Sequence, residues 1–189
     1  MDYLSIKGTN NELFVLFHGT GGNEYHLLQH AGDLNIDASI LSILGNVGEK
    51  EQRRYFEPLE NGKLPRLDVE KRVNDFLTFW ETVEKGQQRV TFLGYSNGAN
   101  FILALLEKNP TIADRAVLLH PANLDFEWET GSEIELYVTA GSLDPLVPAG
   151  EVLKLQKRLA ETFTNTAFKL VDGTHAISPQ EITYLKTVL

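Results

Sequence analysis

The sequence predicts an α/β fold: a mainly parallel sheet of about six to seven strands, with helices on both faces and no cap domain. Three observations predict it. Short apolar segments alternate with longer segments of helical period along the chain. The apolar segments are nearly continuous, which is typical of strands that are covered on both faces of a parallel sheet. Finally, residues 121–133 leave little room for an inserted helical subdomain.

Six short apolar runs are expected to form the main strands. They cover residues 13–17, 40–44, 89–95, 116–119, 134–138 and 167–171. Residues 4–6 are expected to add a short edge strand. Because helical segments separate most of these runs, we expect parallel pairing with right-handed crossovers.

Four segments are expected to form the principal helices. They cover residues 69–83, 97–108 and 152–163, and a last helix begins after Ser178. In the first, apolar residues recur at three- and four-residue spacing, with Asp68 placed to cap the helix and Gly86 to stop it. The second is apolar almost all round, which predicts a buried helix. The last opens with Ser178-Pro179-Gln180-Glu181, a capping box with proline at the first helical position.

Length, charge and cysteine content restrict the class of protein. The 189 residues predict a single domain over residues 1–189. Seventeen basic and 26 acidic residues give a formal net charge of −9, which disfavours nucleic acids and anionic membranes as partners. The chain has no cysteine, which excludes disulfides, thiolate zinc sites, Fe–S clusters and cysteine nucleophiles.

No targeting or membrane segment is recognised in the sequence. Residues 1–7 carry no basic stretch followed by an apolar run, so no signal peptide is expected. No apolar segment approaches the ~18 residues that are needed to span a bilayer. The expected location is the cytoplasm.

The segment Gly94-Tyr95-Ser96-Asn97-Gly98 matches G-x-S-x-G, the pattern of a nucleophile elbow. It lies between an expected strand and an expected buried helix, which is the setting that the motif needs. The tight turn forces the serine into a strained backbone conformation, and the flanking glycines keep side chains from colliding there. We therefore predict Ser96 as a nucleophile. The alternative is a serine that only caps a buried helix.

A serine hydroxyl needs a base that takes its proton. In this architecture the chain order is nucleophile, acid, histidine, and only His120 and His175 follow Ser96. His175 lies in a loop after the last expected strand, whereas His120 directly ends a strand and leaves few residues for an acid. Asp144, which follows the strand ending near residue 138, is predicted as the acid. Asp172 is the competitor, but it is so close to His175 in sequence that it is better explained as shaping the turn.

A glycine-rich turn, His18-Gly19-Thr20-Gly21-Gly22, follows the expected strand at 13–17. Such a turn can direct a backbone N–H at an oxyanion, which requires preorganised donors. We predict an oxyanion hole formed by the backbone N–H groups of Thr20 and Asn97. A phosphate-binding loop is the alternative, although the chain has neither G-x-G-x-x-G nor a P-loop.

Residues 45–66 show no apolar period, and a structureless loop of this length is often functional. The loop follows the expected strand at 40–44, so it is expected to fold over the carboxyl edge of the sheet. Tyr55, Phe56 and Leu59 would then form a wall of the substrate pocket. Trp128 falls near the expected site, where lining the pocket and simple packing are about equally expected.

No metal or organic cofactor is expected. His26 and His30 are four residues apart on an expected helix, and His18 is nearby in sequence. However, neither an H-E-x-x-H motif nor a cysteine accompanies them. We interpret them as surface histidines on an amphipathic helix.

The motifs of the chain resemble those of the α/β-hydrolase superfamily. The matching segments are Leu16-Phe17-His18-Gly19-Thr20-Gly21-Gly22, Gly94-Tyr95-Ser96-Asn97-Gly98-Ala99-Asn100, Leu119-His120-Pro121, residues 141–148 and Gly173-Thr174-His175. They most resemble the compact carboxylesterase/phospholipase group that includes acyl-protein thioesterases, and within it bacterial members associated with quinone stress. The resemblance spans about residues 13–178 and implies the α/β-hydrolase fold with a Ser–Asp–His triad. The chain departs from the family pattern at Thr20, usually a bulky apolar residue, and at Thr174, usually glycine.

The residues and the resemblance predict a serine hydrolase that cleaves small carboxylic esters through a covalent acyl-enzyme. The alternatives are an acyl-thioesterase or lysophospholipase-type hydrolase, and a non-catalytic ligand-binding protein on the same fold. The expected partner is a small-molecule ester substrate, and the sequence leaves a homodimer open. Without a cap, acyl groups of about two to six carbons are expected, because each CH₂ contributes about 0.8 kcal/mol only while a shallow groove covers it.

Overall fold

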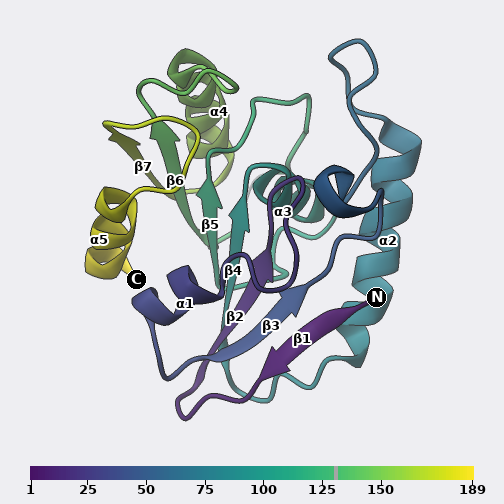
Figure 1. Cartoon of the computed structure of the whole chain (residues 1–189), viewed down its shortest axis with the longest axis vertical. Helices are drawn as coiled ribbons and strands as arrows, with labels where there is room; N and C mark the ends of the chain where they lie inside the picture. The colour runs from purple at the N-terminus through teal and green to yellow at the C-terminus, as the bar shows by residue number, and fades with distance from the viewer. Residues whose placement is uncertain (130–131) are drawn as a thin grey trace.

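A single sheet organises the computed structural model, which describes residues 1–129 and 132–189 (Figure 1). Its seven strands are β1 (Tyr3–Ile6), β2 (Glu12–Phe17), β3 (Ser39–Ile43), β4 (Arg89–Tyr95), β5 (Arg115–Leu119), β6 (Glu135–Gly141) and β7 (Asn165–Val171). They lie in the order β1-β3-β2-β4-β5-β6-β7. Strand β1 is antiparallel to β3 and all other neighbours are parallel. The predicted mainly parallel α/β sheet, with an edge strand at the N-terminus, is confirmed.

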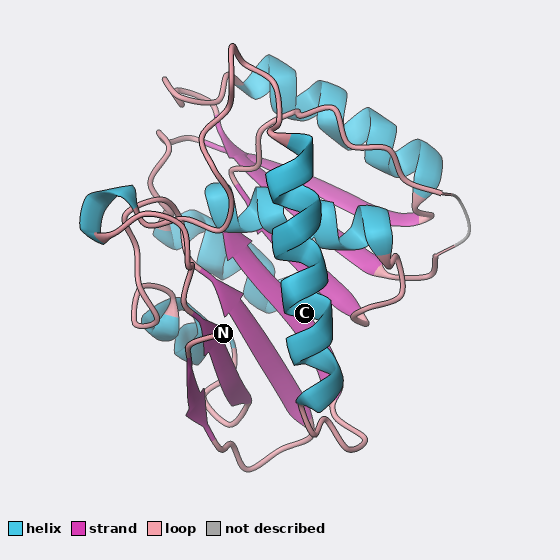
Figure 2. Cartoon of the chain, turned by 90° about the vertical axis from the view of Figure 1, so that its right-hand side faces the viewer, coloured by secondary structure: helices cyan, strands magenta, loops and turns pink. Residues whose placement is uncertain are grey.

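Helices cover both faces of this sheet. They are α1 (Leu28–Leu34), α2 (Arg66–Thr82), α3 (Asn97–Lys108), α4 (Ala149–Thr162) and α5 (Pro179–Val188), with a 3₁₀ turn, η1, at Lys50–Gln52. Successive strand residues point to opposite faces. On β2, Val15 and Phe17 belong to the apolar cluster that contains α2, α3 and α4, whereas Phe14 and Leu16 belong to the cluster that contains α1 and α5. Figure 2 shows α2 lying across the first of these faces.

The core explains why the strands are continuous apolar runs and why α3 is apolar nearly all round. All five residues of β5 are buried, and so is every residue of α3 from Asn97 to Leu106. Helix α3 packs against β4 and β5 and is itself covered by α2. Because α3 has neighbours on most sides, its first residues are held firmly at the carboxyl edge of the sheet.

The predicted ends of α2 need correction. The helix begins at Arg66 with Pro65 at the N-cap, so Asp68 lies within the first turn and does not cap it. There it accepts a 2.8 Å hydrogen bond from the Glu57 N–H. At the other end the helix stops at Thr82, and Gly86, with φ +56°, lies in the following turn. In contrast, the predicted capping box of α5 is present, with both reciprocal hydrogen bonds between Ser178 and Glu181.

Residues 45–66 are not structureless, contrary to expectation. The 3₁₀ turn η1 and two isolated bridges, Val47 with Arg54 and Glu60 with Lys63, give the segment a defined path. It folds over the carboxyl edge of the sheet, as expected, because Tyr55 is buried against Phe17 and Phe101. Among the described residues, no helix combines the length and apolar character required to cross a bilayer.

Candidate active site

Ser96 lies in the tight turn between β4 and α3. Its backbone has φ 52° and ψ −112°, a positive φ that non-glycine residues adopt at a cost and mostly at functional positions. The turn requires Gly98 to lie directly on the end of β2, because a Cβ at this position would collide with the Phe17 carbonyl oxygen. The strand–turn–helix setting of the motif is therefore present.

Loops that follow β4, β6 and β7 bring Ser96, Asp144 and His175 together at the carboxyl edge of the sheet. His175 Nε2 lies 2.9 Å from Ser96 Oγ, and His175 Nδ1 lies 2.6 Å from Asp144 Oδ2. The loops that carry the acid and the histidine touch each other, since a Cβ at Gly141 would collide with the Thr174 carbonyl oxygen. Close contact between these two loops fixes the distance between the two side chains.

Asp144 is buried and has hydrogen-bond donors on both carboxylate oxygens. Its Oδ1 accepts from the backbone N–H groups of Leu146 and Val147, at 2.8 and 2.9 Å, and its Oδ2 faces His175. Burial by itself raises the pKa of Asp144, but the Val147 N–H, the His175 ring and the Leu146 N–H together outweigh it, so the pKa lies below its ordinary value. The carboxylate is therefore ionised at neutral pH.

The charge of Asp144 determines where the His175 proton resides. An ionised carboxylate only accepts hydrogen bonds, so Nδ1 of His175 carries a proton and Nε2 of the neutral ring is free to accept from the Ser96 hydroxyl. Tyr95, a contact that the sequence motif did not suggest, donates a 2.9 Å hydrogen bond from its hydroxyl to the His175 carbonyl oxygen. Burial, followed by the charges of Asp144 and Glu181, raises the pKa of Tyr95, which therefore remains a donor.

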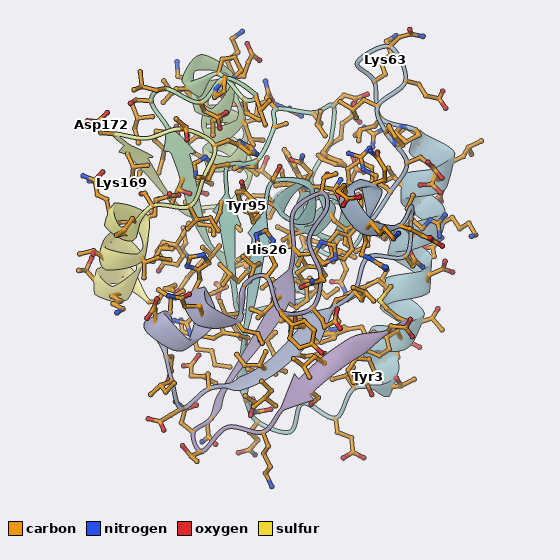
Figure 3. All side chains as sticks on the ribbon, in the orientation of Figure 1. Tyr3, His26, Lys63, Tyr95, Lys169 and Asp172 are labelled. Carbon is orange, nitrogen blue, oxygen red and sulfur yellow. The ribbon has the colours of Figure 1, made fainter. Side chains whose placement is uncertain are left out.

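The rejected candidates for base and acid form no hydrogen bond with the Ser96 hydroxyl, whose partner among the described residues is His175. The His120 ring rests against the acid, with Nδ1 3.4 Å from Asp144 Oδ2. Asp172 is exposed at the outer edge of the molecule (Figure 3), where its Oδ1 accepts a 3.4 Å hydrogen bond from the Ser142 hydroxyl. Neither residue takes a place in the chain of hydrogen bonds that ends at the serine.

Thr20 and Asn97, the predicted oxyanion donors, line one cavity together with Ser96. As the first residue of α3, Asn97 has no intrahelical acceptor for its backbone N–H. The side chain of Asn97 is fixed by the 45–66 segment, because its Oδ1 accepts a 2.9 Å hydrogen bond from the Tyr55 N–H. The Thr20 hydroxyl accepts a 3.1 Å hydrogen bond from Arg54, which ties the glycine-rich turn to the 45–66 segment.

His18, at the start of the glycine-rich turn, is a buried brace that the sequence did not identify. Its Nδ1 lies 2.7 Å from the Gly19 carbonyl oxygen, and its Nε2 lies 3.0 Å from the Gly45 backbone nitrogen. A carbonyl only accepts and an N–H only donates, so the ring is neutral with its proton on Nδ1. Burial lowers the pKa of His18 to about 4, against a weaker opposing effect of the Gly19 carbonyl.

The expectation that His26 and His30 share a helix is wrong. His26 lies in a turn before α1, with its ring 5.7 Å from that of Tyr95, and the two side chains meet near the centre of Figure 3. His30 alone lies on α1. In the described part of the chain, the one group whose potential ligand atoms lie within 4.8 Å of one another is His120, Asp144 and His175. Its atoms are already engaged with one another in the network around the acid.

A cavity of about 140 Å³ opens beside Ser96. Its wall includes Thr20, Arg54, Phe56, Leu59, Ser96 and Asn97. Phe56 and Leu59 therefore lie where the sequence placed them, but Tyr55 does not. Tyr55 is 2% exposed and points into the core, where its hydroxyl donates to the Ile43 carbonyl oxygen and accepts from the His18 N–H. Trp128 packs against Phe163 and donates to the Leu103 carbonyl oxygen, so it also serves packing.

Comparisons with known proteins agree with this architecture. The Dienelactone hydrolase family matches residues 17–181. The "Putative hydrolase MhqD" of Bacillus subtilis (strain 168) is 30% identical over 187 residues, which are 96% of this chain and 94% of that protein. A Bacillus cereus carboxylesterase structure is 28% identical with a TM-score of 0.90, covering 100% of this chain and 92% of that one.

A second solved structure is similarly close. Protein Atu2452 of unknown function from Agrobacterium tumefaciens str. C58 is 30% identical with a TM-score of 0.87, covering 98% of this chain and 94% of that one. The predicted resemblance to the α/β-hydrolase superfamily and the predicted fold are confirmed. Within the described residues, β5 and β6 are joined without an inserted cap of helices.

Proposed function

Because the chain belongs to the dienelactone hydrolase family, we propose that it is a serine hydrolase that cleaves small carboxylic esters through a covalent acyl-enzyme. One observation carries the proposal. A continuous series of contacts runs from Asp144 Oδ2 through both ring nitrogens of His175 to Ser96 Oγ, at 2.6 and 2.9 Å. The 2.9 Å distance is within the range in which a base accepts a proton from a nucleophile, and the 2.6 Å contact with the acid orients that base.

In the proposed reaction, Ser96 Oγ attacks the ester carbonyl carbon while His175 Nε2 takes the hydroxyl proton. The carbonyl oxygen becomes an oxyanion, to which the N–H groups of Thr20 and Asn97 donate. The carbon–oxygen bond to the alcohol then breaks, and the alcohol leaves with the proton from His175. Water repeats the sequence on the acyl-enzyme, which releases the carboxylic acid and restores the hydroxyl.

Asp144 contributes charge and orientation in both halves of this reaction. Its carboxylate holds the His175 ring in the tautomer that presents Nε2 to Ser96, and it stabilises the imidazolium that forms when the proton moves. The two backbone N–H groups on Oδ1 keep the carboxylate from rotating away. A preorganised acid of this kind does not have to be reoriented during the reaction.

The labelling and activity of single-serine variants test the proposal. A fluorophosphonate probe should label the wild type and Ser5→Ala, a control on the exposed edge strand β1, but not Ser96→Ala. Hydrolysis of p-nitrophenyl acetate should fall by several orders of magnitude in Ser96→Ala alone. Retention of more than a few per cent of the activity, with an unchanged melting curve, would refute the nucleophile assignment.

The size of the cavity bears on the acyl group. A cavity of about 150 Å³ in another protein holds a benzene ring, so about 140 Å³ has room for roughly six carbon atoms. In a p-nitrophenyl series from acetate to palmitate, kcat/KM should rise by about fourfold per CH₂ at most, because each contributes about 0.8 kcal/mol, and then level off near six carbons. A continued rise beyond about ten carbons would favour lipid or acyl-protein substrates.

A matched pair of oxygen and thio esters separates the proposed function from its rival in the same enzyme class. Both esters pass through the same acyl-enzyme, so the comparison isolates how the site treats the leaving group. The expected result is a higher kcat/KM for the oxygen ester with an acyl group of about four carbons. The opposite ranking would assign the chain to thioesterases.

A further inference from the structure

A second pair of ionisable side chains lies directly behind Asp144. His120, the residue that follows β5, places Nδ1 3.4 Å from Asp144 Oδ2 and Nε2 3.0 Å from Glu181 Oε1. Glu181 comes from the first turn of α5, the helix that follows the His175 loop. The His120 and Glu181 side chains are both 0% exposed, and that of Asp144 is 1% exposed. Burial of three ionisable groups side by side requires that their charges compensate one another.

The partners of His120 determine its charge. Its two ring nitrogens face carboxylate oxygens, and an ionised carboxylate accepts hydrogen bonds but donates none. Burial raises the pKa of Glu181, but the His120 ring and the Ser178 N–H outweigh burial, and the pKa lies below its ordinary value. The pKa of Asp144 is likewise lowered. With both acids ionised, each ring nitrogen of His120 faces an acceptor, an arrangement that a ring with protons on both nitrogens satisfies.

The geometry of the pair favours charge over a simple hydrogen bond. Although Nε2 and Oε1 are 3.0 Å apart, they are not aligned for hydrogen bonding, and neither atom has another hydrogen-bond partner within the described residues. Opposite charges on these two atoms would compensate their burial, and the Thr139 side chain is a further group that lowers the pKa of Glu181. The backbone at His120 has φ 51°, which is unfavourable for a residue with a side chain and indicates that its placement is imposed by the surrounding structure.

We propose that His120 is a positioning residue for the hydrolysis: paired with Glu181, its protonated ring holds Asp144 ionised and turned so that Oδ2 faces His175. This inference rests on the proposed function, because it assigns a role to the group behind the acid of the triad. Four titratable groups face His120, namely Asp144, Glu181, His175 with its ring 5.3 Å away, and Tyr95 with its ring 6.0 Å away. No lysine or arginine in the described part of the chain forms an ion pair with either carboxylate, so His120 is the basic group that the two carboxylates share.

This arrangement predicts opposite effects of the two members of the pair on the base. Removing the cation in His120→Gln leaves the negative charges of Asp144 and Glu181 uncompensated, which favours the protonated form of His175. The acid limb of the pH profile of kcat/KM should therefore move to higher pH. Removing the carboxylate in Glu181→Gln leaves the cation uncompensated, so the limb should move to lower pH. A charge within about 4–6 Å shifts a pKa by at least about one unit, which is the expected displacement for His120→Gln because the two histidine rings are 5.3 Å apart. Glu181 faces the other nitrogen of the His120 ring, so the displacement in Glu181→Gln should be smaller.

The double variant His120→Gln/Glu181→Gln removes a neutral pair and should return the limb close to that of the wild type. Each single variant should also lose about 10- to 100-fold in kcat with little change in KM, as is typical when a group that orients an active residue is removed. Shifts in the same direction, or no shift in either single variant, would overturn the proposal. A merely structural role would lower activity without moving the limb.

Nitrogen-15 NMR of the histidine side chains tests the charge of His120 without reference to activity. At pH 8, one histidine of the wild-type protein should keep protons on both ring nitrogens, and its signals should vanish in His120→Gln but persist in the control His30→Gln. A neutral His120 ring at pH 8 would overturn the proposal even if Ser96 proves to be the nucleophile. Conversely, an active Ser96→Ala variant would refute the proposed function while leaving the measured charge of His120 intact, so the two failures are distinguishable.

Discussion

Two buried histidines at the same edge of the sheet differ in their partners. His18 follows β2 and has one donor and one acceptor next to its ring, the Gly45 N–H and the Gly19 carbonyl. His120 follows β5 and has carboxylate oxygens next to both nitrogens. The first environment requires a neutral ring, whereas the second accommodates a cation.

The comparison teaches that burial alone does not determine the charge of a histidine. Both rings are almost fully inaccessible, with 2% of His18 and 1% of His120 exposed. Burial disfavours the charged form of His18, whose ring nitrogens face a carbonyl and an N–H, whereas in our proposal the two carboxylates beside His120 compensate a charge on its ring. The neutral ring shapes the turn that carries Thr20, while the charged ring acts on Asp144. In our proposal, a neutral histidine therefore fixes the half of the active site that carries Thr20, and a charged histidine fixes the half that carries Asp144.

The largest expected effect follows from removing the negative charge of Asp144, which contacts both His120 and His175. Asp144→Asn should lower kcat by about 10⁴-fold, because an asparagine neither fixes the working tautomer of His175 nor stabilises its imidazolium. The matched control is Asp172→Asn at the exposed edge, which should retain nearly full activity. Steady-state kinetics with p-nitrophenyl acetate measure both variants. The reverse ranking would transfer the role of the acid to Asp172.

The neutral half of the comparison is tested by the stability of the protein in mild acid. The pKa of His18 is about 4 in the folded protein and about 6.5 when exposed, so the unfolded chain binds more protons between these values. The contribution of His18 to the free energy of unfolding is thus fully present above pH 6.5 and is lost as the pH is lowered towards 4. The contribution of His18 should be a loss of about 2 kcal/mol between pH 7.5 and pH 5.

Urea unfolding at the two pH values measures this loss. His18→Asn should lower stability at pH 7.5, because the brace between the two loops is weakened, but should reduce the loss of stability between pH 7.5 and pH 5 by about 2 kcal/mol. The control His30→Gln should retain the wild-type difference. If His18→Asn kept the full difference, another group would have to be responsible, and the neutral assignment of His18 would fail.

Much of the fold and of the central site could be predicted from the sequence, because both depend on local patterns. Apolar runs marked the strands, and the motif around Ser96, with the chain order of Asp144 and His175, was sufficient to bring these three residues together. What the sequence did not reveal are contacts between distant segments. Glu181 was recognised only as part of a capping box, and nothing local indicates that its other oxygen faces His120.

The wrong prediction for Tyr55 also arises from contacts between distant segments. Tyr55 was expected in the substrate pocket because it is aromatic and lies in a loop without apolar period. Its hydroxyl instead bridges the Ile43 carbonyl and the His18 N–H, which are 12 and 37 residues away in sequence. A tyrosine that hydrogen-bonds inside the core cannot be distinguished by sequence from one that faces a ligand.

The smallest expected effect concerns Tyr95, which connects the two halves of the comparison. Its ring packs against Gly19 in the turn of His18 and lies 6.0 Å from the ring of His120, while its hydroxyl donates 2.9 Å to the His175 carbonyl. Tyr95→Phe keeps the ring and removes only this hydrogen bond, which contributes about 1 kcal/mol, so kcat should fall by about fivefold. The pH dependence of stability and the ring protonation of His120 should not change, because the phenyl ring keeps its contacts with Gly19 and with the His120 ring. Steady-state kinetics, urea unfolding and nitrogen-15 NMR of the same variant measure all three quantities. A change in the charge of His120 or in the acid-induced loss of stability would show that the two histidines are coupled through the tyrosine hydroxyl and are not independent supports.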